Sequence, residues 1–367
     1  MKKILVFVLL SVLCAAVFTG CTRSDSDTVK VDVFWFTYSD TYLTAVRNAM
    51  LEQAKEMPHL RVVMHDCESN QTVQTQKIQT AITQGTNLLV VNIVTTGSED
   101  ASMTIVNLAR AADLPIVFFN REVSNNVIDS YEKACFVGTD ADEAGIMLGE
   151  AIAQFLLAPE NWADGKSIYD LNGDNQINYV MFRGEHGNAE AFGRTKYSIE
   201  TANAELADSG LRLAPSPANQ TSTQYENDGI SNFFLYGNWR SDEATNLMGT
   251  ALSAHSLTNG AIEMIIANND DMALGAIEAI RARGFNTGRE DAGYIPVFGV
   301  DATTVAVEAI RAGRMTSTVL QDAEGMAATI LFLANNIAEG EELFSNTEGF
   351  NIDEGTRKIR VPYDIVN

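Results

Sequence analysis

Apolar residues follow two alternating spacings along the chain from residue 29 onward. Runs in which most positions are apolar, as in buried strands, precede segments with the 3.6-residue period of an amphipathic helix. The first series has strands at 29–36, 60–66, 87–94 and 114–120, with helices at 40–57, 75–85 and 104–113 between them. Continuous apolar strands separated by helices predict a parallel sheet that is covered on both faces.

The same alternation starts again at residue 135. Its strands are predicted at 135–140, 177–184, 263–269 and 295–301, and its helices at 142–158, 189–208, 270–284 and 305–313. The polar segment 214–243 is the least regular region and is predicted to be a surface excursion. A chain of 367 residues exceeds the size at which one hydrophobic core keeps growing. The predicted fold class is therefore α/β, with two Rossmann-like doubly wound parallel-sheet lobes.

Charge and cysteine content narrow the class of protein. The formal net charge of -23 at pH 7 opposes binding to nucleic acid or to anionic lipid. Such a surface suits a soluble protein with small uncharged or cationic ligands. Cys67 and Cys135 are the cysteines of the folded part, and two thiols do not make a disulfide scaffold. We expect both to be buried as small hydrophobic residues.

The first 21 residues form a segment separate from the fold. Two lysines, a short apolar run and small residues before Cys21 are typical of a bacterial signal peptide with a lipobox. Cys21 would then carry the lipid, and residues 22–28 would be a flexible tether. Cleavage by an ordinary signal peptidase near residues 15–16 is the alternative. A membrane span is disfavoured because the apolar run is shorter than the ~20 residues that a bilayer requires.

Polar side chains gather just after the predicted strands. In doubly wound sheets, ligands bind beyond the carboxyl ends of the strands. The residues at these positions are amides, carboxylates and aromatics with one arginine: Tyr38, Asp40, Tyr42, Asn92, the segment 185–194, Asn268, Asn269, Asp270, Asp301, Gln321 and Asp322. Planar polar groups can satisfy hydroxyls that both donate and accept, and aromatic rings can cover the apolar face of a sugar. The set therefore predicts a sugar site.

Helix capping is the alternative explanation for several of these residues. Asp40 and Asp301 each precede a helical pattern, and Asp and Asn are common N-caps. Capping does not require Asn269, Arg194 or Trp239, which favours a binding site for the set as a whole.

Motifs of catalysis are missing from the sequence. The four histidines lack metal-ligand spacing, and there is no G-x-S-x-G elbow, P-loop or G-x-G-x-x-G after the first strand. The adjacent Asp270 and Asp271 do not face each other on a helix, as a glycosidase pair must. We therefore predict a binding protein and not an enzyme.

The segment DLNGDNQIN, residues 170–178, matches the front half of an EF-hand calcium loop. Its positions one, three, five and seven are Asp170, Asn172, Asp174 and Gln176. Position six is Asn175 in place of glycine, which is tolerable because Asn adopts left-handed backbone angles. Position twelve is Met181 in place of the bidentate glutamate. A polar turn that only looks like a metal site is the alternative.

A series of stretches in constant order and spacing resembles one family along nearly the whole chain after the tether. They are YSDTYLTAVRNAM, LLVVNIV, PIVFFNRE, YEKACFVGTD, DLNGDNQI, IIANNDDMALGAIEAI, IPVFGVDA and STVLQDA. On these stretches the chain resembles the bacterial periplasmic glucose/galactose-binding proteins. The resemblance implies two lobes, joined by three hinge strands, that close over one sugar. It places the N-terminal lobe at 29–119 plus 322–357 and the C-terminal lobe, with the calcium loop, at 120–321 plus 358–367.

The resemblance also carries the family's sugar contacts onto this chain. Hydroxyl contacts would come from Asp40, Asn92, Arg194, Asn269 and Asp301. The chain departs from the family at Asn188, which replaces a ligand His, and at Glu190, which replaces an Asp. Because Glu190 has a longer stem, it must fold back, shift the sugar or leave the arginine to hold that end.

The remaining family contacts lie at the ring faces and near a hinge. Tyr42, where the family has Phe, and Trp239 would sandwich the sugar ring. Gln321 stands where the family has Asn. Residues 224–238 look inserted ahead of Trp239, which makes this aromatic position the hardest to assign.

The family's calcium loop also lacks the twelfth-position glutamate and takes a bidentate carboxylate from a distant strand. The matching residue here is Glu263, and Asn178, where the family has Gln, completes an all-oxygen shell. The resemblance therefore implies a structural calcium ion.

The leading hypothesis is a lipid-anchored extracytoplasmic protein that captures glucose or galactose and delivers it to the permease of an ABC importer. A sensory protein that docks to a chemoreceptor would use the same outer surfaces of the lobes as an import protein, so the sequence leaves this alternative open. It also leaves open a different monosaccharide as the ligand. A tethered carbohydrate-active enzyme is a third class. A cytosolic repressor core shares the fold but lacks a signal peptide.

Overall fold

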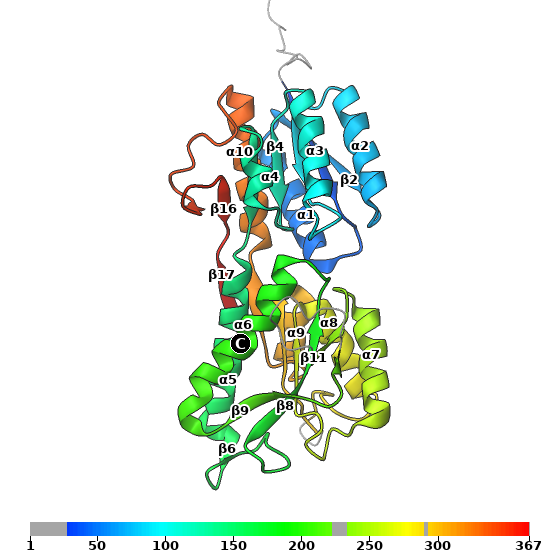
Figure 1. The fold of residues 1–367 in the computed structure, drawn as a ribbon, viewed down its shortest axis with the longest axis vertical. Helices are drawn as coiled ribbons and strands as arrows, with labels where there is room; N and C mark the ends of the chain where they lie inside the picture. Colours follow the sequence, from blue (N-terminus) through cyan, green and yellow to red (C-terminus); the bar gives the residue numbers. More distant parts are fainter. Residues whose placement is uncertain (1–27, 222–232, 290–292, 367) are drawn as a thin grey trace, which may run out of the picture.

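The computed structural model describes residues 28–221, 233–289 and 293–366. It consists of two lobes stacked along the long axis of the molecule, with the N-terminal lobe uppermost in Figure 1. The predicted signal peptide at 1–21 and most of the predicted tether lie outside the described residues. Among the helices of the described ranges, none is both long and apolar enough to cross a membrane.

The first lobe is built on a seven-stranded sheet with the order β15-β16-β5-β4-β3-β1-β2. Its strands are β1 (Val29–Trp35), β2 (Leu60–Asp66), β3 (Leu88–Val91), β4 (Ile116–Phe119), β5 (Ala134–Gly138), β15 (Asn351–Ile352) and β16 (Lys358–Arg360). All neighbours are parallel except the β15–β16 pair at one edge. Its helices are α1 (Thr41–Gln53), α2 (Gln71–Thr83), α3 (Glu99–Ala111), α4 (Asn125–Asp129) and α10 (Ala323–Glu339), with a 3-10 turn η2 (Ala54–Glu56) after α1.

The second lobe repeats this plan with the order β10-β11-β8-β12-β13-β14-β17, and β9 also pairs with β8. Its strands are β8 (Gln176–Arg183), β9 (Arg212–Pro215), β10 (Gln220–Thr221), β11 (Phe233–Tyr236), β12 (Met264–Ala267), β13 (Val297–Asp301), β14 (Ser317–Gln321) and β17 (Tyr363–Val366), with a separate hairpin of β6 (Trp162–Ala163) and β7 (Lys166–Ser167). Its helices are α5 (Ala141–Leu157), α6 (Ala189–Leu206), α7 (Ser241–Ala254), α8 (Asp270–Arg281) and α9 (Thr304–Arg311), with 3-10 turns η3 (Pro159–Asn161) and η4 (Ala207–Ser209).

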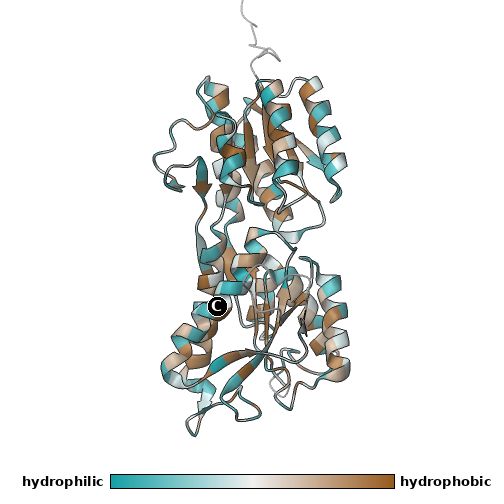
Figure 2. Cartoon of the chain, in the orientation of Figure 1, coloured by the Kyte–Doolittle hydropathy of each residue, from teal (hydrophilic) through white to brown (hydrophobic). Residues whose placement is uncertain are grey.

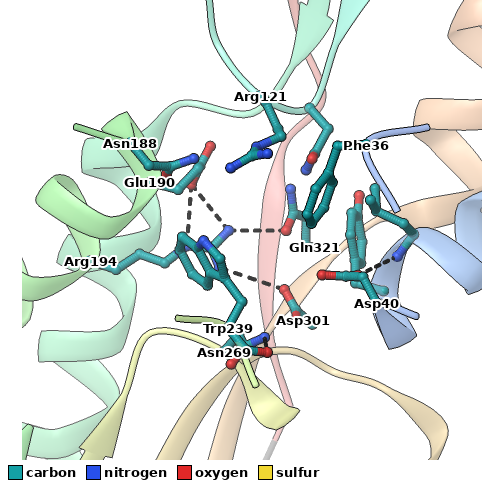
Figure 3. Close-up of a pocket in the computed structure, with 13 residues that line it drawn as sticks. Phe36, Asp40, Arg121, Asn188, Glu190, Arg194, Trp239, Asn269, Asp301 and Gln321 are labelled. Carbon is teal, nitrogen blue, oxygen red and sulfur yellow. Dashed lines mark hydrogen bonds and ion pairs between the residues drawn. The ribbon is translucent and has the colours of Figure 1, made fainter. Parts of the chain in front are cut away.

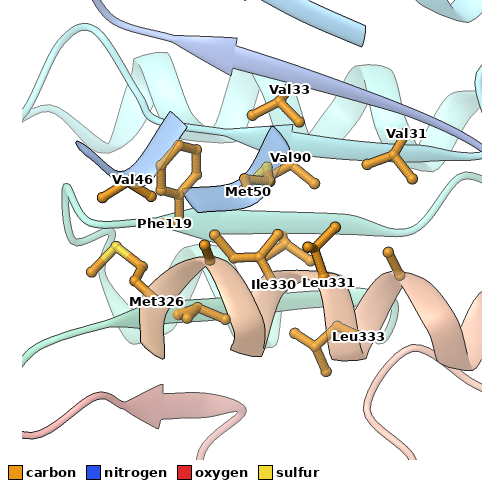
Figure 4. Packing of buried hydrophobic residues seen from close by; sticks show 14 of the residues in the cluster. Val31, Val33, Val46, Met50, Val90, Phe119, Met326, Ile330, Leu331 and Leu333 are labelled. Carbon is orange, nitrogen blue, oxygen red and sulfur yellow. The ribbon is translucent and has the colours of Figure 1, made fainter. Parts of the chain in front are cut away.

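Each sheet has a hydrophobic core on both faces, as the continuous apolar strands predict. In the first lobe, α1 and α10 cover one face, where Val31, Val90 and Phe119 meet Met50 and Ile330 (Figure 4). Helices α2 and α3 cover the other face. Hydropathy colouring shows apolar strands inside and polar helix surfaces outside in both lobes (Figure 2). The doubly wound α/β class is confirmed.

The boundary between the lobes differs from the predicted one. Strand β5 was expected in the second lobe, yet it pairs with β4 in the first sheet. Strand β16 likewise pairs with β5 in the first sheet and not with the second lobe. The chain therefore crosses between lobes near Thr139, between Gln321 and Asp322, and near Pro362, so the predicted limits at 119/120 and 357/358 are wrong. The predicted limits were wrong because the alternation of strands and helices does not indicate after which strand the chain passes from one sheet to the other.

The segment 214–243 was predicted to be a surface excursion, and part of that prediction is wrong. Its short strand β11 pairs in parallel with the end of β8, with Leu235 opposite Phe182. Residues 222–232, which include most of the apparent insertion at 224–238, lie outside the described residues. Because β11 belongs to the sheet, the residues that follow it reach the same edge as those of the other strands.

Candidate ligand site between the lobes

A pocket lies between the lobes at the carboxyl ends of both sheets (Figure 3). The empty space between its lining atoms is about 420 Å³, with open solvent at the mouth included. The first lobe lines it with Phe36, Asp40, Tyr42, Leu43, Asn120 and Arg121, and the second with Asn188, Glu190, Arg194, Trp239, Asn269, Asp301 and Gln321. The lobes are closed on one another, because the Thr41 hydroxyl donates to Asp271 Oδ2 across the cleft at 2.9 Å.

Aromatic rings enter the pocket from both lobes. Phe36 follows β1 in the first lobe, and Trp239 follows β11 in the second (Figure 3). Trp239 has a left-handed backbone with φ 66°, and its indole packs so closely on Gly184 that a Cβ there would lie 2.2 Å from the ring. Tyr42, the predicted second stacking residue, also lines the pocket, with its hydroxyl 3.6 Å from Met326 Sδ. Phe36 was not predicted.

Two carboxylates meet in the pocket, Asp40 from the first lobe and Asp301 from the second (Figure 3). Asp40 is the N-cap of α1, and its Oδ1 accepts the Leu43 N–H at 2.8 Å. Burial raises the pKa of Asp40 to about 6. Asp301 ends β13 with φ 125°, and its closest cation is Arg194 Nη1 at 3.6 Å. Burial also raises the pKa of Asp301 well above its ordinary value. Both groups are hydrogen-bonding partners for the hydroxyl groups of a ligand.

Arg194 lies 3% exposed on α6, at the centre of a network that reaches the hinge. Its donors go to the Asn268 carbonyl at 2.8 Å, and to Gln321 Oε1 and the Tyr363 hydroxyl at 3.0 Å each. The hydroxyl of Tyr363 in turn donates to Thr139 Oγ1 at 2.7 Å. Thr139, Gln321 and Tyr363 come from the three crossings between the lobes, so the hinge itself fixes the guanidinium.

The side chain of Glu190 folds back toward its own helix. This is one of the three alternatives that the sequence left open. Its Oε2 accepts from Arg194 Nε at 3.2 Å and from the Tyr363 hydroxyl at 3.0 Å, and its Oε1 accepts from Thr139 at 2.8 Å. The longer stem lets the carboxylate pair with the arginine one turn further along α6. Glu190 is 5% exposed, and this pairing compensates its buried charge.

Two of the predicted amide contacts are helix caps that also line the pocket. Asn188 caps α6 by accepting the Ala191 N–H at 3.0 Å, and Asn269 caps α8 by accepting the Met272 N–H at 3.0 Å. Asn269 is therefore a cap, contrary to the prediction that capping does not require it. A cap uses the side-chain oxygen, and Asn269 Nδ2 donates to the Trp239 carbonyl at 3.3 Å, which fixes the loop that carries the indole.

Asn92 lies behind the pocket and does not line it. It is fully buried, and its amide donates to the Phe119 carbonyl and to Asn120 Oδ1 at 3.0 Å each. Its predicted contact with sugar is therefore replaced by a supporting role, in which Asn92 holds the turn that presents Asn120 and Arg121. Neither residue was predicted to line the site, although both follow β4 and satisfy the same strand-end rule.

The loop at 170–178 folds as a tight polar turn. Asp170 accepts the N–H groups of Gly173, Asp174 and Asn175, and Asn175 has the left-handed φ of 61° that its position was expected to need. The remaining predicted ligands of the loop also accept or donate within it: Asn172 accepts from Asp174 N, Asp174 accepts from Gln176 N, and Asn178 donates to the Gly260 carbonyl.

Glu263 joins this loop to β12 from a buried position. Its two oxygens accept the N–H groups of Leu171 and Asn178 at 2.7 and 2.8 Å. Burial, with Asp170 and Asp174 nearby, raises the pKa of Glu263. These oxygen donors fit a hard cation by chemistry. Their oxygens face backbone amides, however, and within the described ranges no three His, Cys, Asp or Glu side chains converge as a metal site.

Residues 31–342 match the family described as periplasmic binding protein domain, which is well over half of the chain. The chain belongs to the periplasmic binding protein family. This confirms the resemblance and the type of two-lobed fold that it implied. The family consists of solute-binding proteins, so the prediction of a binding protein and not an enzyme is confirmed too. Membership also implies an extracytoplasmic location.

Several periplasmic binding proteins are similar over nearly the whole chain. The D-galactose/methyl-galactoside binding periplasmic protein of Haemophilus influenzae is 32% identical over 334 residues, covering 91% of this chain and 88% of its own. The ribose import binding protein of Escherichia coli K12 is 22% identical over 343 residues, covering 94% and 95%. A solute binding protein from Bacillus halodurans with bound myo-inositol superposes with a TM-score of 0.67 at 25% identity, covering 94% and 96%.

Proposed function

We propose that this periplasmic binding protein captures a neutral pyranose hexose, glucose or galactose, and delivers it to the permease of an ABC importer. The observation that carries the proposal is the pocket between the lobes, where two aromatic faces enclose carboxylates, amides and two arginines. Nine of the ten residues predicted from the family's sugar contacts line it. The galactose-binding relative supports the class of ligand.

The chemistry of the pocket suits a polyhydroxylated ring. The carboxyl groups of Asp40 and Asp301 form hydrogen bonds with hydroxyl groups. Phe36 and Trp239 cover the apolar C–H faces of the ring. Because Glu190 is held by Arg194 and Tyr363, it is a weaker partner for the anomeric end than the family's shorter Asp. We therefore propose an epimer preference that differs from the family's near-equal acceptance.

A cyclitol is the second candidate ligand. The structural relative from Bacillus halodurans has myo-inositol bound. A cyclitol has no anomeric hydroxyl, so it does not need the acceptor that the family's Asp provides at the position of Glu190. The same pocket could then hold all of its hydroxyl groups with Asp40, Asp301 and the amides.

Calorimetry against glucose, galactose, ribose, xylose and myo-inositol tests the proposal. We expect one of the two hexoses to bind at micromolar concentration or tighter, with the other epimer at least tenfold weaker. Binding of myo-inositol alone would establish the second candidate. Failure of glucose and galactose at millimolar concentration, with a pentose or disaccharide binding instead, would overturn the hexose proposal and leave the family assignment standing.

Variants that keep the helix caps separate ligand contact from folding. Asn269→Ser retains a capping oxygen on α8 but is too short to reach a ligand, so affinity is expected to fall at least tenfold with little change in melting temperature. Gln84→Ser at the exposed end of α2 is the matched control, which leaves affinity unchanged. Loss of affinity in both variants, or in neither, would remove Asn269 from the site.

The structural calcium ion and the lipid anchor at Cys21 remain proposals. The calcium proposal rests on the resemblance of the loop at 170–178 to the front half of an EF-hand loop, to which Glu263 is joined by hydrogen bonds. The anchor is supported by the lipobox pattern, and Cys21 lies outside the described residues. Docking of the sugar-bound form to a chemoreceptor is the alternative to import, and both would use outer surfaces of the lobes.

A further inference from the structure

An ion pair joins the lobes at one edge of the pocket. Arg121, from the turn after β4, donates through Nη2 to Glu185 Oε2, from the turn after β8. The other oxygen of Glu185 accepts from Thr96 Oγ1 at 3.3 Å, so both of its oxygens are bound by the first lobe. Gly97 and Gly187 touch beside them through their backbones. These contacts exist only while the lobes are closed.

Arg121 is held rigidly in the first lobe. It is 4% exposed, and its Nη1 donates to the carbonyls of Ile93 at 3.2 Å and Val94 at 2.8 Å. Its guanidinium carbon lies 4.2 Å from the centre of the Phe36 ring. The arginine therefore fixes the stacking face of the first lobe by a cation–π contact.

Glu185 is connected to the stacking face of the second lobe through its neighbour in the chain. It follows Gly184, against which the Trp239 indole packs. A continuous series of contacts therefore joins the two rings. Phe36 contacts Arg121, Arg121 pairs with Glu185, and the chain neighbour of Glu185, Gly184, packs against Trp239. One ion pair links the two rings that face the ligand, and it forms at the same step as the enclosure of a ring between them.

We propose that Arg121 is a positioning residue whose ion pair with Glu185 latches the two stacking faces together and slows release of the bound sugar. The proposal rests on the proposed function, in that it assigns the latch to a sugar held between Phe36 and Trp239. Opening the lobes costs the ion pair, whereas the first encounter with sugar occurs before the pair forms. The latch therefore acts on the dissociation rate.

Stopped-flow Trp fluorescence of Glu185→Gln with the better hexose tests this inference. Glu185 does not line the pocket, so the direct contacts with sugar stay intact. We expect the dissociation rate to rise about tenfold and the association rate to stay within twofold. Glu185→Asp, which keeps the charge, should recover part of the slow release.

Glu99→Gln, in the first lobe near Thr96, is the matched control. Glu99 binds Ser124 Oγ and Asn126 Nδ2, both in its own lobe, so neither rate should change. Equal dissociation rates for Glu185→Gln and Glu99→Gln would overturn the latch while sugar binding itself stood. If the wild-type protein bound no monosaccharide, the proposed function would fail. Small-angle scattering of the two ligand-free variants would then test the latch separately. A larger radius of gyration for Glu185→Gln than for Glu99→Gln supports the latch, and equal radii overturn it.

Discussion

Closure of the lobes should depend on the absence of a side chain at Gly97. This residue lies in the turn before α3 and meets Gly187 of the other lobe. A Cβ at Gly97 would lie 3.0 Å from both the Cα and the carbonyl oxygen of Gly187, closer than carbon atoms normally approach. Gly97 does not line the pocket, so Gly97→Ala changes the approach of the lobes without removing a ligand contact.

The size of the effect follows from the cost of inserting one methyl group into a packed contact. Overpacking costs about 1–3 kcal/mol, and since 1.4 kcal/mol is tenfold in affinity, sugar should bind roughly 5- to 150-fold more weakly. Gly97 also has a φ of 71°, so alanine adds backbone strain of roughly 1–2 kcal/mol. That strain is present in the open and closed forms alike, and it lowers the melting temperature without changing affinity.

Gly85→Ala is the control that separates the two effects. Gly85 has a φ of 74°, and a Cβ there would meet no atom within 4 Å. Calorimetry and thermal unfolding of both variants are expected to show similar losses of melting temperature but weakened sugar binding only for Gly97→Ala. Equal affinity of the two variants would refute the claim that the Gly97–Gly187 contact belongs to the ligand-bound form.

Three further predictions concern pH, metal and membrane. The pKa of Asp40 is about 6 in the folded protein against 3.8 when unfolded, so the folded state binds more protons between these values and stability should fall as pH rises from about 4 to 6. Asp40→Asn keeps the cap and should flatten this dependence of stability on pH in thermal unfolding. An unchanged dependence in the variant would count against Asp40 as its source. Calcium at a hundredfold excess over its dissociation constant should contribute about 2.7 kcal/mol of stability, so chelation should lower the melting temperature. Glu263→Gln should reduce the sensitivity of the melting temperature to chelator. A melting curve that chelator leaves unchanged would rule out the ion. Cys21→Ser should release the protein from the membrane fraction into the soluble extracytoplasmic fraction, and retention of that variant would argue against the lipid anchor.

The sequence predicted the fold class and most of the pocket because one rule covers both. Strand ends of a parallel sheet meet at one edge, so Asp40, Arg194 and Asp301 could be brought together before any coordinates were known. The same rule already covers Arg121, which directly follows the predicted strand at 114–120, and it would have covered Asn120 if that strand had been ended one residue earlier. Element boundaries are the weakest product of periodicity, and for Asn120 one residue decided the outcome.

Other features required tertiary contacts that periodicity does not encode. Asn92 satisfies the strand-end rule, yet its amide is used up by the carbonyl of Phe119 and by Asn120. Strand β5 belongs to the first sheet because it pairs with β4 and β16. The residues of β5 alone do not indicate which sheet it joins. The fold of Glu190 onto Arg194 depends on Tyr363, more than 160 residues further along the chain.

A crystal structure of the protein with the hexose that binds more tightly tests the central claim most directly. The account predicts a pyranose ring between Phe36 and Trp239, with hydroxyl groups bonded to Asp40 and Asp301 and the Arg121–Glu185 pair formed beside it. A sugar bound outside this pocket, or a pocket that stays empty between closed lobes in saturating sugar, would contradict the account.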